Sequence, residues 1–152
     1  MSIFTGYDFA HFEKFSLWLL NKLFPYDRLM NLKRLTHLHL GNKQCQSFNF
    51  YEGVAPVLDA CGNNILKLVL EEFTEVDVDY IGEKCPNVQH LAISATLAFA
   101  PIGQLNPAFF TKLQTLELWN KFGQEHEWCI SPSVLRQLLY RSTKLDYLLL
   151  QR

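Results

Sequence analysis

The chain has 152 residues, with 14 basic and 15 acidic side chains and a formal net charge of −1 at pH 7. This balance excludes the basic surface that is typical of nucleic-acid-binding domains, and it leaves no polyacidic tail. A hydrophobic content of 49% with only 19% charged residues excludes a disordered chain. Leucine alone occupies 26 positions, so the first question is whether the leucines are periodic.

Residues 1–30 are predicted to form an N-terminal helical or capping region. The stretch from Tyr7 to Leu23 has the pattern of an amphipathic helix that closes the first of the units described below. The apolar run from Phe15 to Leu20 is too short to span a membrane, and acidic Asp8 and Glu13 precede it where a signal peptide would be basic. Because the four cysteines form no C-x-x-C pair, we expect reduced thiols and a cytoplasmic or nuclear location, with no membrane association.

From residue 31 onward the pattern L-x-x-L-x-L recurs five times, with starts 30, 23, 25 and 32 residues apart. In each copy the last two apolar residues are two positions apart, so they point to the same side of a strand. The five copies, which predict five strands, are Leu35-Leu38-Leu40, Ile65-Leu68-Leu70, Val88-Leu91-Ile93, Leu113-Leu116-Leu118 and Leu145-Leu148-Leu150.

Helical patterns lie between these strands. Val76, Tyr80 and Ile81 recur at helical spacing, and Cys85-Pro86 ends that helix because proline cannot continue it. Ser131-Pro132 supplies an N-cap and a first-turn proline before a helix whose apolar face contains Val134, Leu135, Leu138 and Leu139. A strand and a helix cannot bury their apolar faces alone, but stacked units can. We therefore predict an open α/β solenoid of about five irregular repeats over residues 31–152, with parallel strands on the concave face and helices on the convex face.

The segment from Phe73 to Ile93 resembles a cysteine-containing leucine-rich repeat, and Cys85-Pro86-Asn87-Val88 matches the "C-P-x-L" start of the next strand. The resemblance covers roughly residues 30–152 and implies a relation to F-box leucine-rich-repeat proteins, the substrate-binding subunits of cullin ubiquitin ligases. An F-box opens with Leu-Pro, which this chain lacks. Ligase components are therefore expected as partners only if an F-box is present elsewhere in the full-length protein. In the other repeats the position of Cys85 is taken by Leu32, Phe110 and Ser142, and Cys61 is one residue further from its strand.

Side chains that alternate with the core leucines are predicted to point outward from the concave face. They form three predicted rows across the strands, in which exposed aromatic and aliphatic groups are candidate anchors for a protein partner. Two alternatives stay open: Trp119 packs against the loop 120–131, or a further repeat covers Leu149. The candidate partner-binding residues are His37, His39, Lys67, Val69, Glu71, His90, Glu117, Trp119, Tyr147 and Leu149.

No catalytic or metal motif is found, so we expect neither an enzyme nor a cofactor. The histidines on neighbouring strands would need a further ligand close by to hold a metal, and solvated histidines are the simpler interpretation. Glu125-His126-Glu127 is interpreted as a solvated turn, and the acidic run from Glu71 to Asp79 as a solvated strand-to-helix loop. The cysteines are interpreted as small buried apolar residues.

The function predicted from these features is recognition of a protein partner through the concave face. Its most concrete form, implied by the resemblance, is substrate recognition in a ubiquitin ligase of the cullin type. A leucine-rich-repeat scaffold without a ligase role and a small α/β enzyme are the alternatives. Because the chain stops at Gln151-Arg152 without a polar cap, we also expect a fragment of a longer solenoid, or a last strand that packs on another chain or frays.

Overall fold

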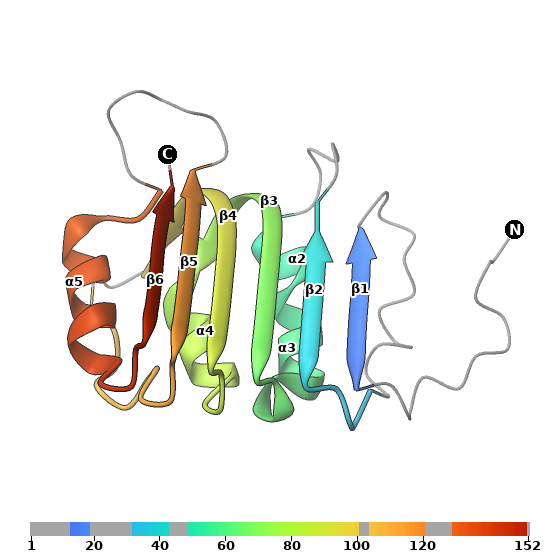
Figure 1. Ribbon diagram of the computed structural model, residues 1–152. Coiled ribbons are helices and arrows are strands. Elements are labelled where there is room, and N and C mark those ends of the chain that lie inside the picture. Colours follow the sequence, from blue (N-terminus) through green and yellow to red (C-terminus); the bar gives the residue numbers. More distant parts are fainter. Residues whose placement is uncertain (1–12, 19–31, 43–48, 101–103, 121–128, 152) are drawn as a thin grey trace, which may run out of the picture.

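The computed structural model describes residues 13–18, 32–42, 49–100, 104–120 and 129–151. These residues form one open sheet of six parallel strands in sequential order, and α2, α3 and α4 lie behind it (Figure 1). The strands are β1 (Lys14–Trp18), β2 (His37–Gly41), β3 (Lys67–Asp77), β4 (His90–Phe99), β5 (Thr115–Asn120) and β6 (Tyr147–Gln151). The helical segments are α2 (Phe50–Gly53), α3 (Ala55–Cys61), the 3-10 turn η2 (Gly62–Asn64), α4 (Val78–Lys84) and α5 (Pro132–Arg141).

The five strand motifs form β2 to β6, and the predicted register between them is confirmed. Leu38 pairs with Leu68, Leu68 with Leu91, and the same position continues through β5 and β6. In β2 to β5 the last two apolar residues of every motif are at most 1% exposed. The leucine periodicity therefore builds one continuous core between the sheet and its helices.

Backbone hydrogen bonds repeat from unit to unit although the units differ in length. The carbonyl of Leu66 accepts from the N–H groups of Gln89 at 2.8 Å and His90 at 3.0 Å. The same double acceptor recurs at every junction between adjacent strands, at Glu13, Thr36, Leu66, Gln89 and Gln114. One turn also recurs before β2 to β6, in which a carbonyl accepts from the N–H three residues later, at Leu32, Gly62, Cys85, Phe110 and Ser142. Leu32, Phe110 and Ser142, the predicted counterparts of Cys85, each provide the turn carbonyl in their unit. In the unit before β3 this carbonyl belongs to Gly62, the residue after Cys61.

The helix predicted from Tyr7 to Leu23 is wrong for Lys14–Trp18, which forms β1 and pairs with β2 in parallel. The rest of that stretch lies outside the described residues. Phe15 pairs with Leu38, and Leu17 pairs with Leu40. The sequence Phe12-x-x-Phe15-x-Leu17 is thus the same motif with phenylalanine in two leucine positions, a substitution that a search for leucine overlooks.

The acidic run after Leu70 is not the predicted loop, because β3 continues to Asp77. Glu72 has a φ of 64°, and the pairing with β4 shifts between Leu70 and Phe73, which are the marks of a bulge. Beyond the bulge Phe73 pairs with Ala95, so the strand gains a second paired stretch. Consequently α4 begins at Val78, and Val76, which the helical spacing included, belongs to β3.

The helix ends follow from local capping chemistry. The carboxylate of Asp77, only 3% exposed, accepts from the N–H of Tyr80 at 2.9 Å and caps α4. The predicted stop at Cys85-Pro86 is confirmed, since α4 ends at Lys84. At α5 the predicted cap is also confirmed: Ser131 Oγ accepts from the N–H of Val134 at 3.3 Å, and a proline follows in the first turn.

Candidate functional site

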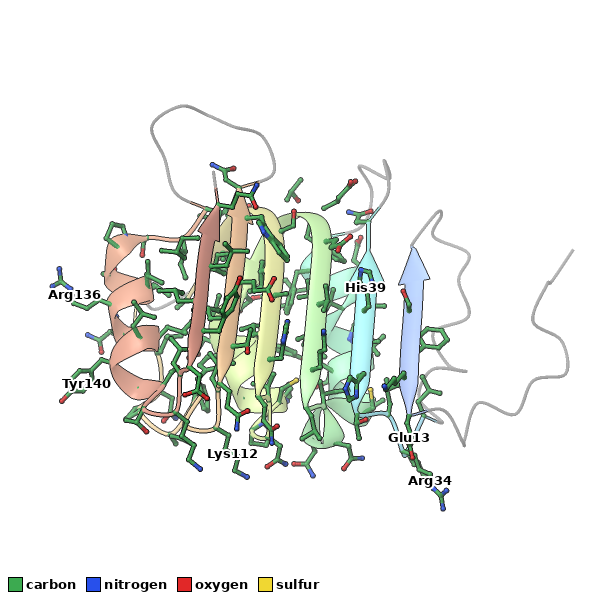
Figure 2. The ribbon with its side chains drawn as sticks, viewed as in Figure 1. Glu13, Arg34, His39, Lys112, Arg136 and Tyr140 are labelled. Carbon is green, nitrogen blue, oxygen red and sulfur yellow. The ribbon has the colours of Figure 1, made fainter. Side chains whose placement is uncertain are left out.

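The candidate site is the face of the sheet opposite the helices, here called the open face. Alternation along the strands places the predicted partner-binding residues on it, and Figure 2 shows His39 on this face of β2. Strand pairing aligns them in three rows, and β1 extends the first and second rows by one position each. The first row is Lys14, His37, Lys67, His90, Thr115 and Tyr147, and the second is Ser16, His39, Val69, Ala92, Glu117 and Leu149. The third row, which the bulge between β3 and β4 interrupts, consists of Gly41 and Glu71 on one side and Ser94, Trp119 and Gln151 on the other.

The first row begins with four basic or titratable side chains on four adjacent strands. We call Lys14, His37, Lys67 and His90 the basic row. Each pairs in register with the next across the sheet. Lys14 is exposed, and the other three are half-buried. Adjacent strands are about 4.8 Å apart, so the basic row spans about 14 Å of the open face.

Two histidine–glutamate contacts link neighbouring rows. His39 Nε2 lies 3.4 Å from Glu71 Oε1, and His90 Nε2 lies 3.4 Å from Glu117 Oε1. Both pairs connect a histidine to a glutamate one strand further along the chain and one row closer to the carboxyl ends of the strands. Ser16 Oγ lies 3.1 Å from His39 Nδ1. The four ion-paired side chains are 20–32% exposed, and pairs this accessible to water contribute less than about 1 kcal/mol each.

The histidines of the basic row are poorly protonated at neutral pH. Burial lowers the pKa of His37 below its usual 6.5, and the positive charges of Lys14 and Lys67 lower it further, against a small opposing effect of Glu13. Burial also lowers the pKa of His90, together with Lys67 and His37, while Glu117 opposes the change. Both histidines are therefore positioned to gain a proton when a negative charge approaches.

The open face is hollowed over β1, β2 and β3. A depression of about 380 Å³ is lined by Lys14, Phe15, Ser16, His37, Leu38, His39, Lys67 and Val69. A second hollow of about 630 Å³ follows the edge of the sheet where the strands begin, and its lining includes Glu13, Arg34 and Lys112. Figure 2 shows these three residues along that edge. The first hollow combines apolar walls with basic groups, which suits a ligand that is partly apolar and negatively charged.

The predicted anchors lie at the other end of the open face. Tyr147 is 50% exposed, while Trp119 and Leu149 are half-buried. The loop proposed to cover Trp119 falls largely on residues 121–128, outside the described residues, so that alternative stays open. Glu125-His126-Glu127 also lies there. Trp119, Tyr147 and Leu149 extend the candidate interface over β5 and β6.

Among the described residues, no group of three or more His, Cys, Asp or Glu side chains is arranged to hold a metal ion. Cys61, Cys85 and Cys129 are free and buried, which confirms their interpretation as core residues, while Cys45 lies outside the described residues. Burial raises the pKa of the Cys61 thiol to about 11 and that of Cys85 to about 12, so neither is a thiolate at neutral pH.

The residues that sequence reasoning missed are those of β1. Lys14 and Ser16 continue the first and second rows beyond His37 and His39. Their signal was the alternation around Phe15 and Leu17, which the helical interpretation of the segment concealed. The addition matters because Lys14 completes the basic row.

Comparison with protein-family models, with curated proteins and with solved structures finds no significant match to the chain. The described part of the chain contains no helix that is long and apolar enough to cross a membrane.

Proposed function

We propose that the chain forms a leucine-rich-repeat solenoid that binds a protein partner through its open face. The observation that carries the proposal is the register of β1 to β6, which aligns side chains from six separate segments in two continuous rows and in a third row that the β3 bulge interrupts. The recurring turn and the recurring double acceptor support a repeat architecture. The sequential strand order supports it too, because a doubly wound sheet reverses its strand order at a switch point.

The composition of the open face supports recognition of protein. Its rows combine histidines, lysines and glutamates with Trp119, Tyr147 and Leu149, and interfaces are enriched in aromatic residues that anchor a partner. Helices α2, α3 and α4 lie behind the sheet (Figure 1), so the open face is the surface that this arrangement leaves for a ligand.

The narrower form of the proposal is substrate recognition in a ubiquitin ligase, in the cytoplasm or nucleus. It rests on the resemblance of the segment from Phe73 to Ile93 to a cysteine-containing repeat. A pull-down of the full-length gene product with the ligase adaptor tests this form separately. Absence of adaptor binding removes the ligase role and leaves partner recognition as proposed.

Site-specific photocrosslinking in cells tests the general proposal. A photoreactive amino acid replaces Val69 at the centre of the open face, and in a matched variant it replaces Arg136 on α5. Arg136 is exposed and projects away from the sheet (Figure 2). We expect a discrete protein adduct from position 69 and none from position 136. Adducts at position 136 alone, or at neither position, contradict the proposal.

A further inference from the structure

We infer that the partner contributes an acidic extended segment that lies across β1 to β4, with carboxylates at alternate positions bound by the basic row. The inference rests on the proposed function, because it specifies the partner of the same open face. Geometry, unpaired charge and the hollow over the first three strands each support it.

The spacing of the basic row matches an extended acidic chain. Lys14 and Lys67 are two strands apart, a separation of about 10 Å, and the whole row spans about 14 Å. In an extended chain, side chains on one face are about 6.7 Å apart, so three alternate carboxylates span about 13 Å. A segment of five residues therefore covers the row when it runs across the strands.

The two lysines of the row have charge available for such a ligand. Neither Lys14 nor Lys67 forms an ion pair with another described residue, whereas the glutamates of the open face lie against His39 and His90. The depression of about 380 Å³ lies against both lysines and adds the apolar side chain of Val69. Charge and space therefore coincide at one place on the sheet.

The size of the open face also favours an extended segment over a globular surface. Six strands and three rows cover about 24 Å by 13 Å, or about 300 Å². A standard protein interface buries about 800 Å² on each partner, so a rigid domain needs contacts well beyond the rows. A single segment laid across the strands does not.

A nucleic acid fits less well than an acidic protein segment. The chain carries a net charge of −1, and Glu71 and Glu117 lie on the same face as the basic row. Glu75 follows on β3 beyond the rows. A long polyanion would meet these carboxylates, whereas three carboxylates on a short segment stay within the row.

Binding is expected to strengthen as the pH falls. His37 is flanked by Lys14 on β1, Lys67 on β3 and Glu13, and His90 by Lys67, His37 and Glu117. A bound carboxylate favours the protonated imidazole, so complex formation takes up protons. Glutamate in the ligand stays ionised above pH of about 4.3, and we expect affinity to rise about fivefold per histidine between pH 7.5 and 5.5.

The test is a fluorescence-anisotropy titration of the full chain at low salt with a labelled peptide of alternating serine and glutamate that has three glutamates. The comparison ligand has glutamine at those three positions. The row variant is Lys14→Gln with Lys67→Gln. The charge-matched control is Arg136→Gln with Lys144→Gln, which removes two positive charges at exposed positions on α5 and before β6. Circular dichroism checks that both variants fold.

We expect the native chain to bind the glutamate peptide at least about tenfold more tightly than the glutamine peptide, because hydrogen bonds between charged groups are stronger than those between neutral groups. The affinity of the row variant for the glutamate peptide should fall at least about fivefold. That of the control variant should fall less than about twofold, because charges far from the ligand are screened. His37→Gln with His90→Gln should abolish the pH dependence. Equal affinity for the two peptides, equal losses in row and control variants, or tighter binding of a single-stranded oligonucleotide overturns the inference.

The photocrosslink separates this inference from the proposed function. If the adduct at position 69 persists unchanged in the Lys14→Gln, Lys67→Gln background, the inference of an acidic segment is wrong. The proposal that a partner binds the open face is then retained. If the adduct is lost in that background and kept in the control, both stand. If no adduct forms at position 69 in the native background, both are wrong.

Discussion

Strands β4 and β6 carry the same motif and differ in burial. Leu91 in β4 is fully buried, whereas Leu148, its counterpart in β6, is 41% exposed. Leu150 is half-buried, while its counterpart Ile93 is fully buried. The reason is position: β4 pairs with strands on both sides, and in the described sheet β6 pairs with β5 alone. In a stack of repeats the motif supplies apolar surface, and the next unit decides how much of it is covered.

Truncation of the two leucines tests this comparison most strongly. We expect Leu91→Ala to lower the free energy of unfolding by about 3 kcal/mol, because it leaves a cavity in close-packed surroundings. Leu148→Ala should cost less than about 1 kcal/mol, since much of the side chain already contacts water. Urea denaturation followed by circular dichroism measures both. Equal losses in the two variants would contradict the difference in burial.

The recurring turn gives a second contrast between an interior unit and the last unit. A methyl group added at Gly62 would lie 2.6 Å from the carbonyl oxygen of Lys84 and 3.2 Å from Cys85 Sγ. Because the nearest atom belongs to the backbone, Gly62→Ala should cost about 2–3 kcal/mol through overpacking. The equivalent Ser142 donates from Oγ to the carbonyl of Leu138 at 2.7 Å, so Ser142→Ala should cost about 1 kcal/mol. Thermal unfolding of the two variants measures their loss of stability. A larger loss in Ser142→Ala than in Gly62→Ala would refute the expected order.

Helix caps provide a third, smaller contrast. Asp77 caps α4 and also accepts from the hydroxyl of Tyr51, so Asp77→Ala should cost about 2 kcal/mol. Ser131→Ala at α5 removes a cap alone and should cost about 1 kcal/mol. Denaturant titration of the two variants measures the difference. A cost at Ser131 equal to that at Asp77 would show that the contact with the Tyr51 hydroxyl adds nothing to stability.

The same contact gives a pH signature. The hydrogen bond to Asp77, followed by burial, raises the pKa of Tyr51 to about 12. A pKa raised above its unfolded value near 10 means that this stability is fully present below pH of about 10 and is lost as the pH rises toward 12. Absorbance at 295 nm should show late-titrating tyrosines in the native chain. Burial and Asp59 also raise the pKa of Tyr80 to about 12, so the titration of Tyr51 is identified by its dependence on Asp77. In Asp77→Ala that titration should move toward pH of about 10, and no movement would contradict the assignment.

The smallest effect is expected on the open face. Glu117→Gln removes the charge beside His90 and should change stability by less than about 1 kcal/mol. Because Glu117 opposes the lowering of the His90 pKa, its removal should lower that pKa further. NMR titration of the His90 ring protons measures the change. A rise in the His90 pKa would show that the pair is absent in solution.

Much of the repeat pattern was predictable from the sequence, because it depends on local spacing. Apolar residues two positions apart identified the register of five strands, and the proline after Ser131 and the one after Cys85 marked helix ends. The extension of β3 was not predictable in this way. It depends on a bulge at Glu72 and on pairing of the following residues with β4, neither of which local polarity indicates.

The alternation of side chains, determined by the sequence alone, placed His37, Lys67 and His90 in one row, because a strand turns every second residue to the same face. Only the tertiary structure decided that Lys14 joins them. The alternation around Phe15 and Leu17 was a weak sign of a strand in a segment that also fits an amphipathic helix. Pairing with β2, a contact between segments 23 residues apart, decided between the two. The basic row, and with it the proposed acidic partner, is therefore a property of the assembled sheet, since its charges come from four separate units.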